Sequence, residues 1–160
     1  MRWAPHTRGG AQDLLDPTRY LADAPLSRLS EDVVLEITER ASLDAMPDVR
    51  MRIAKLRELG FRIALDDLGA GYAGLTSFAL LEPEFVKLDM SLVRDVHQSA
   101  TKRKIIGAMV RLCHDMGKQI VAEGVESREE RDALVECGCD LLQGYLFAKP
   151  GRAFPACTAG

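Results

Sequence analysis

Four apolar runs in this chain end in acidic or basic side chains: VVLEITE (33–39), FRIALDDLG (61–69), FVKLD (85–89) and IVAEGVE (120–126). A fifth run, CDLLQG (139–144), ends in an amide. A single carboxylate after an apolar run carries little information. A series of them, separated by amphipathic helices, indicates a parallel α/β fold with oxygen ligands gathered at the carboxyl ends of its strands.

The segments between and around these runs predict alternating strands and helices. Strands are expected at 33–38, 61–66, 85–88, 119–123 and 141–147, and helices at 13–26, 46–59, 73–81, 100–116 and 127–137. The last helix opens with a capping box, Ser127 followed by Glu130, and stops at Gly138. Short loops between alternating elements imply parallel strands joined by right-handed crossovers.

The chain is expected to hold one partial barrel domain. An irregular leader is expected at 1–10, the domain at 11–150 and a tail at 151–160. An eight-stranded barrel needs about 250 residues, and five strands are counted here, so the barrel is expected to be incomplete at the N-terminus. The helix at 100–116 is expected to bury six side chains: Ile105, Ile106, Met109, Val110, Leu112 and Cys113.

Composition excludes several classes of protein. The net charge is −3, so no broad basic surface is available for a nucleic acid polymer. No apolar stretch approaches the ~20 residues of a membrane helix, and the first ten residues lack the apolar core of a signal peptide. The four cysteines have no metal-ligand spacing beyond one C-x-C, which is typical of reduced thiols in a cytoplasmic protein.

Strand parity predicts that charged side chains meet on the inner face of the barrel. If the neighbouring aliphatic residues pack outward, Glu36, Asp66, Lys87, Asp89 and Glu123 point inward. Like charges share such a site only with a cation, and ligands that are all oxygen favour Mg²⁺, Mn²⁺ or Ca²⁺ over zinc. The adjacent carboxylates of Asp66 and Asp67 suit two bridged ions and phosphoryl displacement.

Each of these residues, taken alone, has a plainer interpretation. Glu36 is compatible with a solvated strand end, and Asp66-Asp67 before a glycine with a turn or a helix cap. Lys87 is compatible with a surface lysine, and Glu123 with a loop before the capped helix. The joint occurrence of these residues, rather than any one of them, favours a catalytic site.

Five ordered motifs resemble the EAL domain of bacterial cyclic di-GMP phosphodiesterases. They are LEITER (35–40), DDLGAGYAGL (66–75), FVKLDMSLV (85–93), IVAEGVES (120–127) and GCDLLQGYLFAKP (138–150), and the resemblance runs from about residue 13 to 150. It implies a TIM-like barrel that uses Mg²⁺ or Mn²⁺ to hydrolyse cyclic di-GMP to linear pGpG.

The resemblance implies roles for eight residues. The implied metal ligands are Glu36, Asp66, Asp67 and Glu123; Lys87 and Glu123 are catalytic, Glu126 and Gln143 lie near the nucleotide, and Glu39 steadies the loop after Asp67. Lys87 would position the attacking water, and Glu123 would act as second-metal ligand or general base. The loop after Asp67 would also mediate a homodimer.

This sequence departs from the family pattern in two ways. Leu68 replaces a phenylalanine, and Ala73-Gly74 replace two serines whose hydroxyls would brace the loop. The Glu-Ala-Leu strand is absent, and no asparagine occurs in the 160 residues to serve as the family's other early metal ligand. The first metal site is therefore expected to be impaired. The alternative hypothesis is a degenerate EAL module that binds cyclic di-GMP or a protein without catalysis.

Overall fold

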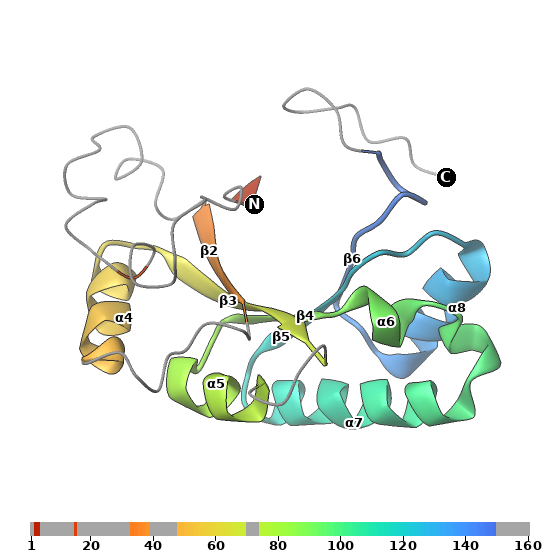
Figure 1. The fold of residues 1–160 in the computed structure, drawn as a ribbon, viewed down its shortest axis with the longest axis horizontal. Coiled ribbons are helices and arrows are strands. Elements are labelled where there is room, and N and C mark those ends of the chain that lie inside the picture. The colour runs from red at the N-terminus through yellow and green to blue at the C-terminus, as the bar shows by residue number, and fades with distance from the viewer. Residues whose placement is uncertain (1, 4–14, 16–32, 39–47, 70–73, 150–160) are drawn as a thin grey trace. The chain divides into compact units, whose positions relative to one another are not determined.

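The computed structural model describes residues 2–3, 15, 33–38, 48–69 and 74–149. Its backbone contacts divide the chain into two compact units, Met1–Phe85 and Val86–Gly160. Strands and helices alternate along both units (Figure 1), which confirms the predicted α/β class.

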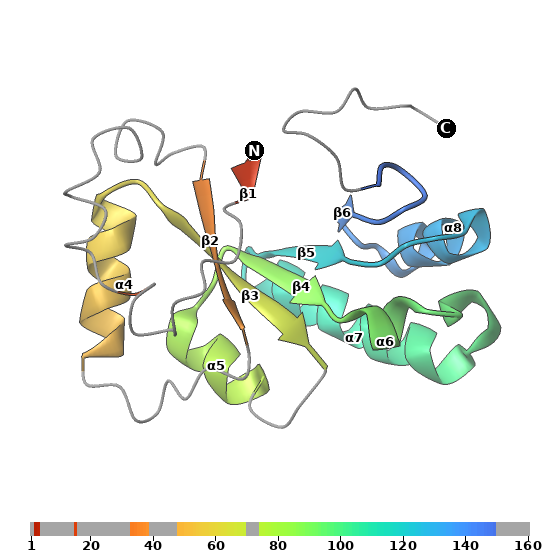
Figure 2. The ribbon, with the colours of Figure 1, turned by 45° about the horizontal axis from the view of Figure 1, so that its top comes forward.

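The described part of the first unit contains three strands in the order β1 (Arg2–Trp3), β2 (Val33–Thr38) and β3 (Arg62–Leu68). Neighbouring strands are parallel, and β2 and β3 lie side by side in Figure 2. The register aligns Val34 with Arg62 and Thr38 with Asp66. The β-branched composition of β2 suits a strand whose aliphatic side chains are buried.

Helices α4 (Val49–Glu58) and α5 (Gly74–Leu81) complete the described part of this unit. Val49, Ile53 and Leu56 lie on one stripe of α4 and are buried. The turn after α5 is tied to α4 by one side chain. Arg57 donates from Nε to Glu84 Oε1 at 2.7 Å and from Nη2 to the carbonyl oxygen of Glu82 at 2.7 Å.

The described part of the second unit contains three strands in the order β4 (Phe85–Leu88), β5 (Gln119–Ala122) and β6 (Leu141–Leu142). The first residue of β4, Phe85, is the last residue of the first unit. Between them lie α6 (Met90–Val93), the 3₁₀ turn η3 (Val96–Gln98), α7 (Ala100–Asp115) and α8 (Arg128–Cys137). Helix α7 packs against α8, β5 and η3. The parallel pair of β5 and β6 aligns Val121 with Leu141.

Helix α7 buries a narrower stripe than the sequence predicted. Ile106, Val110 and Cys113 are buried at the helical spacing of four and three residues. Ile105 and Leu112 are each 43% exposed, so the expectation that they point inward was wrong. Each of them precedes a buried residue by one position, so its side chain lies about 100° around the helix axis from the side chain of that buried residue.

Two further sequence predictions need correction. The predicted strand 141–147 stops at Leu142, because the chain then turns and the N–H groups of Phe147 and Ala148 donate to the carbonyl oxygen of Gly144. The leader that was expected to be irregular contains β1.

The elements α6 and η3 were not predicted, and the helix predicted at 13–26 lies outside the described residues except for Leu15. None of the described helices has the length and apolar character to cross a membrane.

Candidate functional site

The predicted ligands Glu36 and Asp66 lie on the same face of the first unit's strands. The register pairs Glu36 on β2 with Ala64 on β3, and Asp66 is two residues beyond Ala64. Side chains alternate with a period of two along a strand, so Glu36, Ala64 and Asp66 project from one face. The inference from strand parity therefore agrees with the observed pairing of these two strands.

Asp66 and Asp67 form an unusual end to β3. The Asp66 side chain is buried, with 3% relative exposure, and its Oδ1 accepts a hydrogen bond from the Asp67 N–H at 3.1 Å. Asp67 has a φ of 60°, in the left-handed region that a non-glycine residue adopts at a cost in free energy. Such local strain is concentrated at functional sites. Glu39, the predicted loop-stabilising residue, lies outside the described residues.

Lys87 and Glu123 are brought together in the second unit. Lys87, on β4, is 4% exposed, and its Nζ lies 2.9 Å from Oε1 of Glu123, which directly follows β5. An ammonium group withdrawn from water needs a nearby opposite charge, which the carboxylate of Glu123 supplies. The sequence predicted catalytic roles for both residues but not their ion pair.

Tight backbone packing fixes the loop that follows β5. Gly124 has a φ of 72°, and a Cβ atom there would lie 2.9 Å from Cβ of Met90. The Val125 N–H donates to the carbonyl oxygen of Gln143 at 3.1 Å. A Cβ atom on Gly144 would lie 2.1 Å from the carbonyl oxygen of Val125. The loop carrying Glu123 and the backbone of Gln143 are therefore in direct contact.

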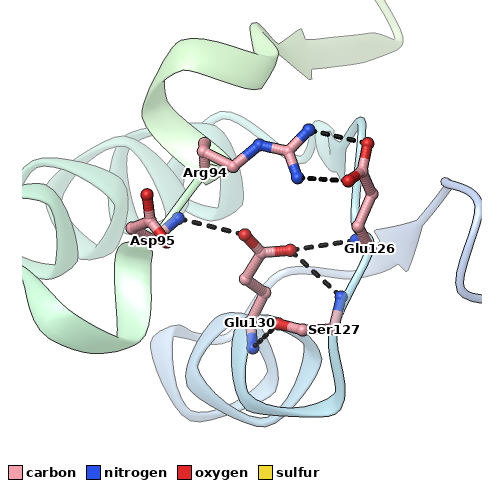
Figure 3. A network of polar contacts seen from close by, with 5 residues as sticks. All are labelled: Arg94, Asp95, Glu126, Ser127 and Glu130. Atoms are coloured by element: carbon pink, nitrogen blue, oxygen red, sulfur yellow. Dashed lines mark hydrogen bonds and ion pairs between the residues drawn. The ribbon is translucent and has the colours of Figure 1, made fainter.

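The predicted nucleotide-binding residue Glu126 makes a two-pronged ion pair with Arg94. Nη1 of Arg94 lies 2.6 Å from Oε2 of Glu126, and Nη2 lies 2.7 Å from Oε1 (Figure 3). The hydrogen bond from Arg94 lowers the pKa of the Glu126 carboxyl below its usual value of 4.5. The same bond raises the pKa of Arg94. Both groups are therefore ionised at neutral pH.

Glu130, in the first turn of α8, accepts hydrogen bonds from backbone groups of two loops. Its Oε2 accepts from the N–H groups of Glu126 (2.9 Å) and Ser127 (3.2 Å), and its Oε1 accepts from the N–H of Asp95 (3.0 Å). Its own N–H donates to Ser127 Oγ at 3.2 Å, which completes the predicted capping box. Burial raises the pKa of this carboxyl, but the backbone donors outweigh burial, and the net pKa is lowered.

The sequence identified one half of this polar network. The capping box of Ser127 and Glu130 has a local signature and was predicted. The contacts to Arg94 and Asp95 were missed, because they join positions more than 30 residues apart that carry no shared motif. Gln143, placed near the nucleotide by the sequence, is exposed directly after β6, next to the Glu123–Ser127 loop.

The residues of both units supply the same kind of chemistry. Glu36, Asp66 and Asp67 in the first unit, and Glu123 in the second, offer carboxylate oxygens near the ends of strands. Carboxylates without histidine or cysteine suit hard divalent cations such as Mg²⁺ and Mn²⁺. The carboxylates of each unit are therefore chemically suited to the metal ions that the sequence predicted.

Comparison with protein families matches residues 12–150 to the EAL domain. The match covers the five motifs that were identified in the sequence and confirms the predicted family. The family has a TIM-like barrel fold, and solved structures of its members cover most of the chain.

Individual relatives are named both as enzymes and as regulators. The chain is 37% identical over 118 residues to the cyclic di-GMP phosphodiesterase RocR of Pseudomonas aeruginosa, covering 74% of this chain and 30% of RocR. It is 33% identical to the blue light- and temperature-regulated antirepressor BluF of Escherichia coli, covering 74% of this chain and 30% of BluF. The chain thus spans less than a third of each relative.

Solved structures extend the similarity to ligand-bound proteins. The structure of Klebsiella pneumoniae BlrP1 in complex with manganese and cyclic di-GMP superposes with a TM-score of 0.75 and 39% identity, covering 83% of this chain and 34% of BlrP1. A calcium and cyclic di-GMP complex of the same protein gives a TM-score of 0.74.

Proposed function

Because the chain belongs to the EAL domain family, we propose that it forms part of a catalytic domain that hydrolyses cyclic di-GMP to linear pGpG. The observation that carries this proposal is the ion pair of the buried Lys87 with Glu123, within a family match that runs from residue 12 to 150. A long-decayed binding module would more often have lost Asp67, Lys87 or Glu123.

In the proposed reaction, water attacks one phosphorus of the cyclic dinucleotide. A new phosphorus–oxygen bond forms and the bond to one ribose 3′-oxygen breaks. That oxygen takes a proton from solvent and becomes a hydroxyl, and the ring opens to a chain with one terminal phosphate. The Lys87 ammonium donates hydrogen bonds that orient the attacking water. The Glu123 carboxylate, whose Oε1 lies 2.9 Å from Lys87 Nζ, accepts a proton from the attacking water.

Four carboxylates are proposed to hold Mg²⁺ or Mn²⁺: Glu36, Asp66, Asp67 and Glu123. When bound, these ions would polarise the phosphate and lower the pKa of a coordinated water. Their binding would also neutralise the charge of neighbouring carboxylates, which otherwise repel one another. The common face of Glu36 and Asp66 and the strained backbone of Asp67 support this assignment.

The remaining assignments follow the family resemblance. We propose that Glu126 and Gln143 contact the nucleotide, which agrees with the hydrogen bond that joins their two segments, from the Val125 N–H to the carbonyl oxygen of Gln143. Glu39 and a homodimer through the loop after Asp67 stay proposals, since Glu39 and residues 70–73 lie outside the described part of the chain. The free thiols of Cys113, Cys137 and Cys139 are in keeping with the cytoplasmic location proposed from the sequence.

The test is hydrolysis of cyclic di-GMP by the full chain, measured by chromatography of pGpG with Mn²⁺ or Mg²⁺ present. We expect Glu123→Gln to abolish pGpG formation, because the amide neither accepts the proton nor offers a charged ligand. The matched control is Glu129→Gln, which makes the same change at an exposed position of α8 and should leave turnover unaffected. Measurable pGpG formation at the same rate in wild type and Glu123→Gln would refute the catalytic assignment.

A binding role is the second candidate, and the similarity to the antirepressor BluF favours it. In that case the chain would bind cyclic di-GMP or a partner protein without forming pGpG. Calorimetric titration with cyclic di-GMP separates the two candidates. Binding without product would support the second candidate, and the absence of both would refute the first.

A further inference from the structure

Two loops of the second unit are joined by the carboxylate of Glu130. The first loop follows α6 and contains Arg94 and Asp95, and the second follows β5 and contains Glu126 and Ser127 (Figure 3). Glu130 is 2% exposed and accepts one backbone hydrogen bond from the first loop and two from the second. The second loop starts at Glu123, whose carboxylate pairs with Lys87 on β4.

The contacts of Glu130 exceed what helix capping requires. In a capping box the glutamate needs to accept only the N–H of the N-cap residue, which is Ser127. Here it also accepts the N–H of Asp95, a residue 35 positions earlier whose φ of 55° is unfavourable for a side chain larger than glycine. Placing a carboxylate almost out of water costs free energy unless hydrogen bonds replace the lost hydration. The three N–H donors provide that replacement.

A second connection between the same two loops is partly exposed to solvent. Arg94 holds both carboxylate oxygens of Glu126, at 2.6 and 2.7 Å. The backbone around Arg94 is itself anchored, because Lys102 Nζ donates to the carbonyl oxygens of Ser91 and Arg94. The backbone of Glu126 is thus fixed by Glu130, and its side chain is fixed by Arg94.

We propose that Glu130 is a positioning residue for ligand binding: by tying the loop after α6 to the loop after β5, it sets the orientation in which Glu126 meets cyclic di-GMP. This inference rests on the proposed function, in which Glu126 contacts the nucleotide. Glu130 makes no contact with the ligand in this scheme. Its effect reaches the ligand through the backbone N–H of Glu126 and through the Arg94 side chain that the two loops bring to Glu126.

The test compares three variants of the full chain. Glu130→Ala removes all three acceptor contacts. Glu130→Gln keeps one carbonyl oxygen, which can serve the N–H groups of Glu126 and Ser127, and places an amide donor where Asp95 needs an acceptor. Ser127→Ala is the matched control, because it weakens the start of α8 by removing the Oγ acceptor but leaves the Glu130 carboxylate in place.

Two measurements distinguish positioning from a merely structural role. In calorimetric titration with cyclic di-GMP and calcium ions, we expect Glu130→Ala to raise Kd about tenfold, because the loop loses its fixed geometry. Glu130→Gln breaks the contact to Asp95 and should also raise Kd, by about threefold or more, whereas Ser127→Ala should bind like wild type. Hydrogen exchange should accelerate at Asp95 in both Glu130 variants, but at Glu126 and Ser127 only in Glu130→Ala.

Each unfavourable outcome has a separate meaning. If wild type binds cyclic di-GMP and Glu130→Ala binds equally well, the positioning role is refuted and the proposed function stands. If Ser127→Ala loses as much affinity as Glu130→Ala, helix destabilisation explains the loss and the positioning role is again refuted. If wild type does not bind cyclic di-GMP, the proposed function and the ligand-positioning role both fail.

Discussion

Replacing Gly144 with alanine should disrupt the loop that carries Glu123 and Glu126. The added Cβ atom would lie 2.1 Å from the carbonyl oxygen of Val125 and 2.3 Å from its nitrogen. Both neighbours are backbone atoms, so no side-chain rotation can relieve the overlap. The two segments would have to separate by more than about 1 Å to reach an ordinary van der Waals distance.

The cost can be estimated from the contacts that such a separation breaks. Val125 donates to Gln143 at 3.1 Å and accepts from Leu146 at 3.0 Å, and Val125 is fully buried. Two buried hydrogen bonds at about 1 kcal/mol each, together with some loss of packing, give a destabilisation of about 2–4 kcal/mol. Overpacking measured in other cores costs about 1–3 kcal/mol, which agrees. For a domain of this size the melting temperature should fall by roughly 4–16 °C.

Gly107→Ala is the matched control for this change. Gly107 lies inside α7, and a Cβ atom there would meet only Arg111 Nη1, at an ordinary distance of 3.5 Å. Alanine in a helix interior is more favourable than glycine by about 0.5–1 kcal/mol, so this variant should be slightly more stable than wild type. Urea unfolding followed by circular dichroism measures both variants. A Gly144→Ala protein as stable as wild type would refute the contact between residue 144 and Val125.

Two further predictions concern titratable groups of the second unit. Burial raises the pKa of Cys113 to about 11 and that of Cys139 to about 12, from 9.0. Native Cys113 should therefore react with iodoacetamide at least ~10²-fold more slowly than the denatured protein does. Equal alkylation rates in peptide mass spectrometry would contradict the burial of this thiol. The pKa of Glu130 is lowered from 4.5, so its carboxylate stabilises the fold above that pH, and the stabilisation is lost as pH falls through the folded-state value. The difference in unfolding free energy between wild type and Glu130→Gln should shrink on acidification, and a difference that stays constant from pH 7 to pH 3 would contradict the assignment.

Local sequence determined most of the secondary structure and the family. The strands at 33–38 and 85–88 were predicted with the observed bounds, because short, mostly apolar runs fit a buried strand and the first of them is rich in β-branched residues. The stop of α8 at Gly138, whose φ is 90°, was also predicted, since glycine adopts that backbone at little cost. The acidic ends of the runs pointed to the family, which the match over residues 12–150 confirmed.

Tertiary contacts decided the features that the sequence could not predict. The segment Leu141–Phe147 was predicted as one strand, but only Leu141 and Leu142 pair with β5, because Gly144 packs on the backbone of Val125 and the chain turns there. The ion pair of Lys87 with Glu123 joins residues more than 30 positions apart, and so does the hydrogen bond from the Asp95 N–H to Glu130. Propensity and periodicity act over a few residues, whereas these contacts depend on which loops the folded strands bring together.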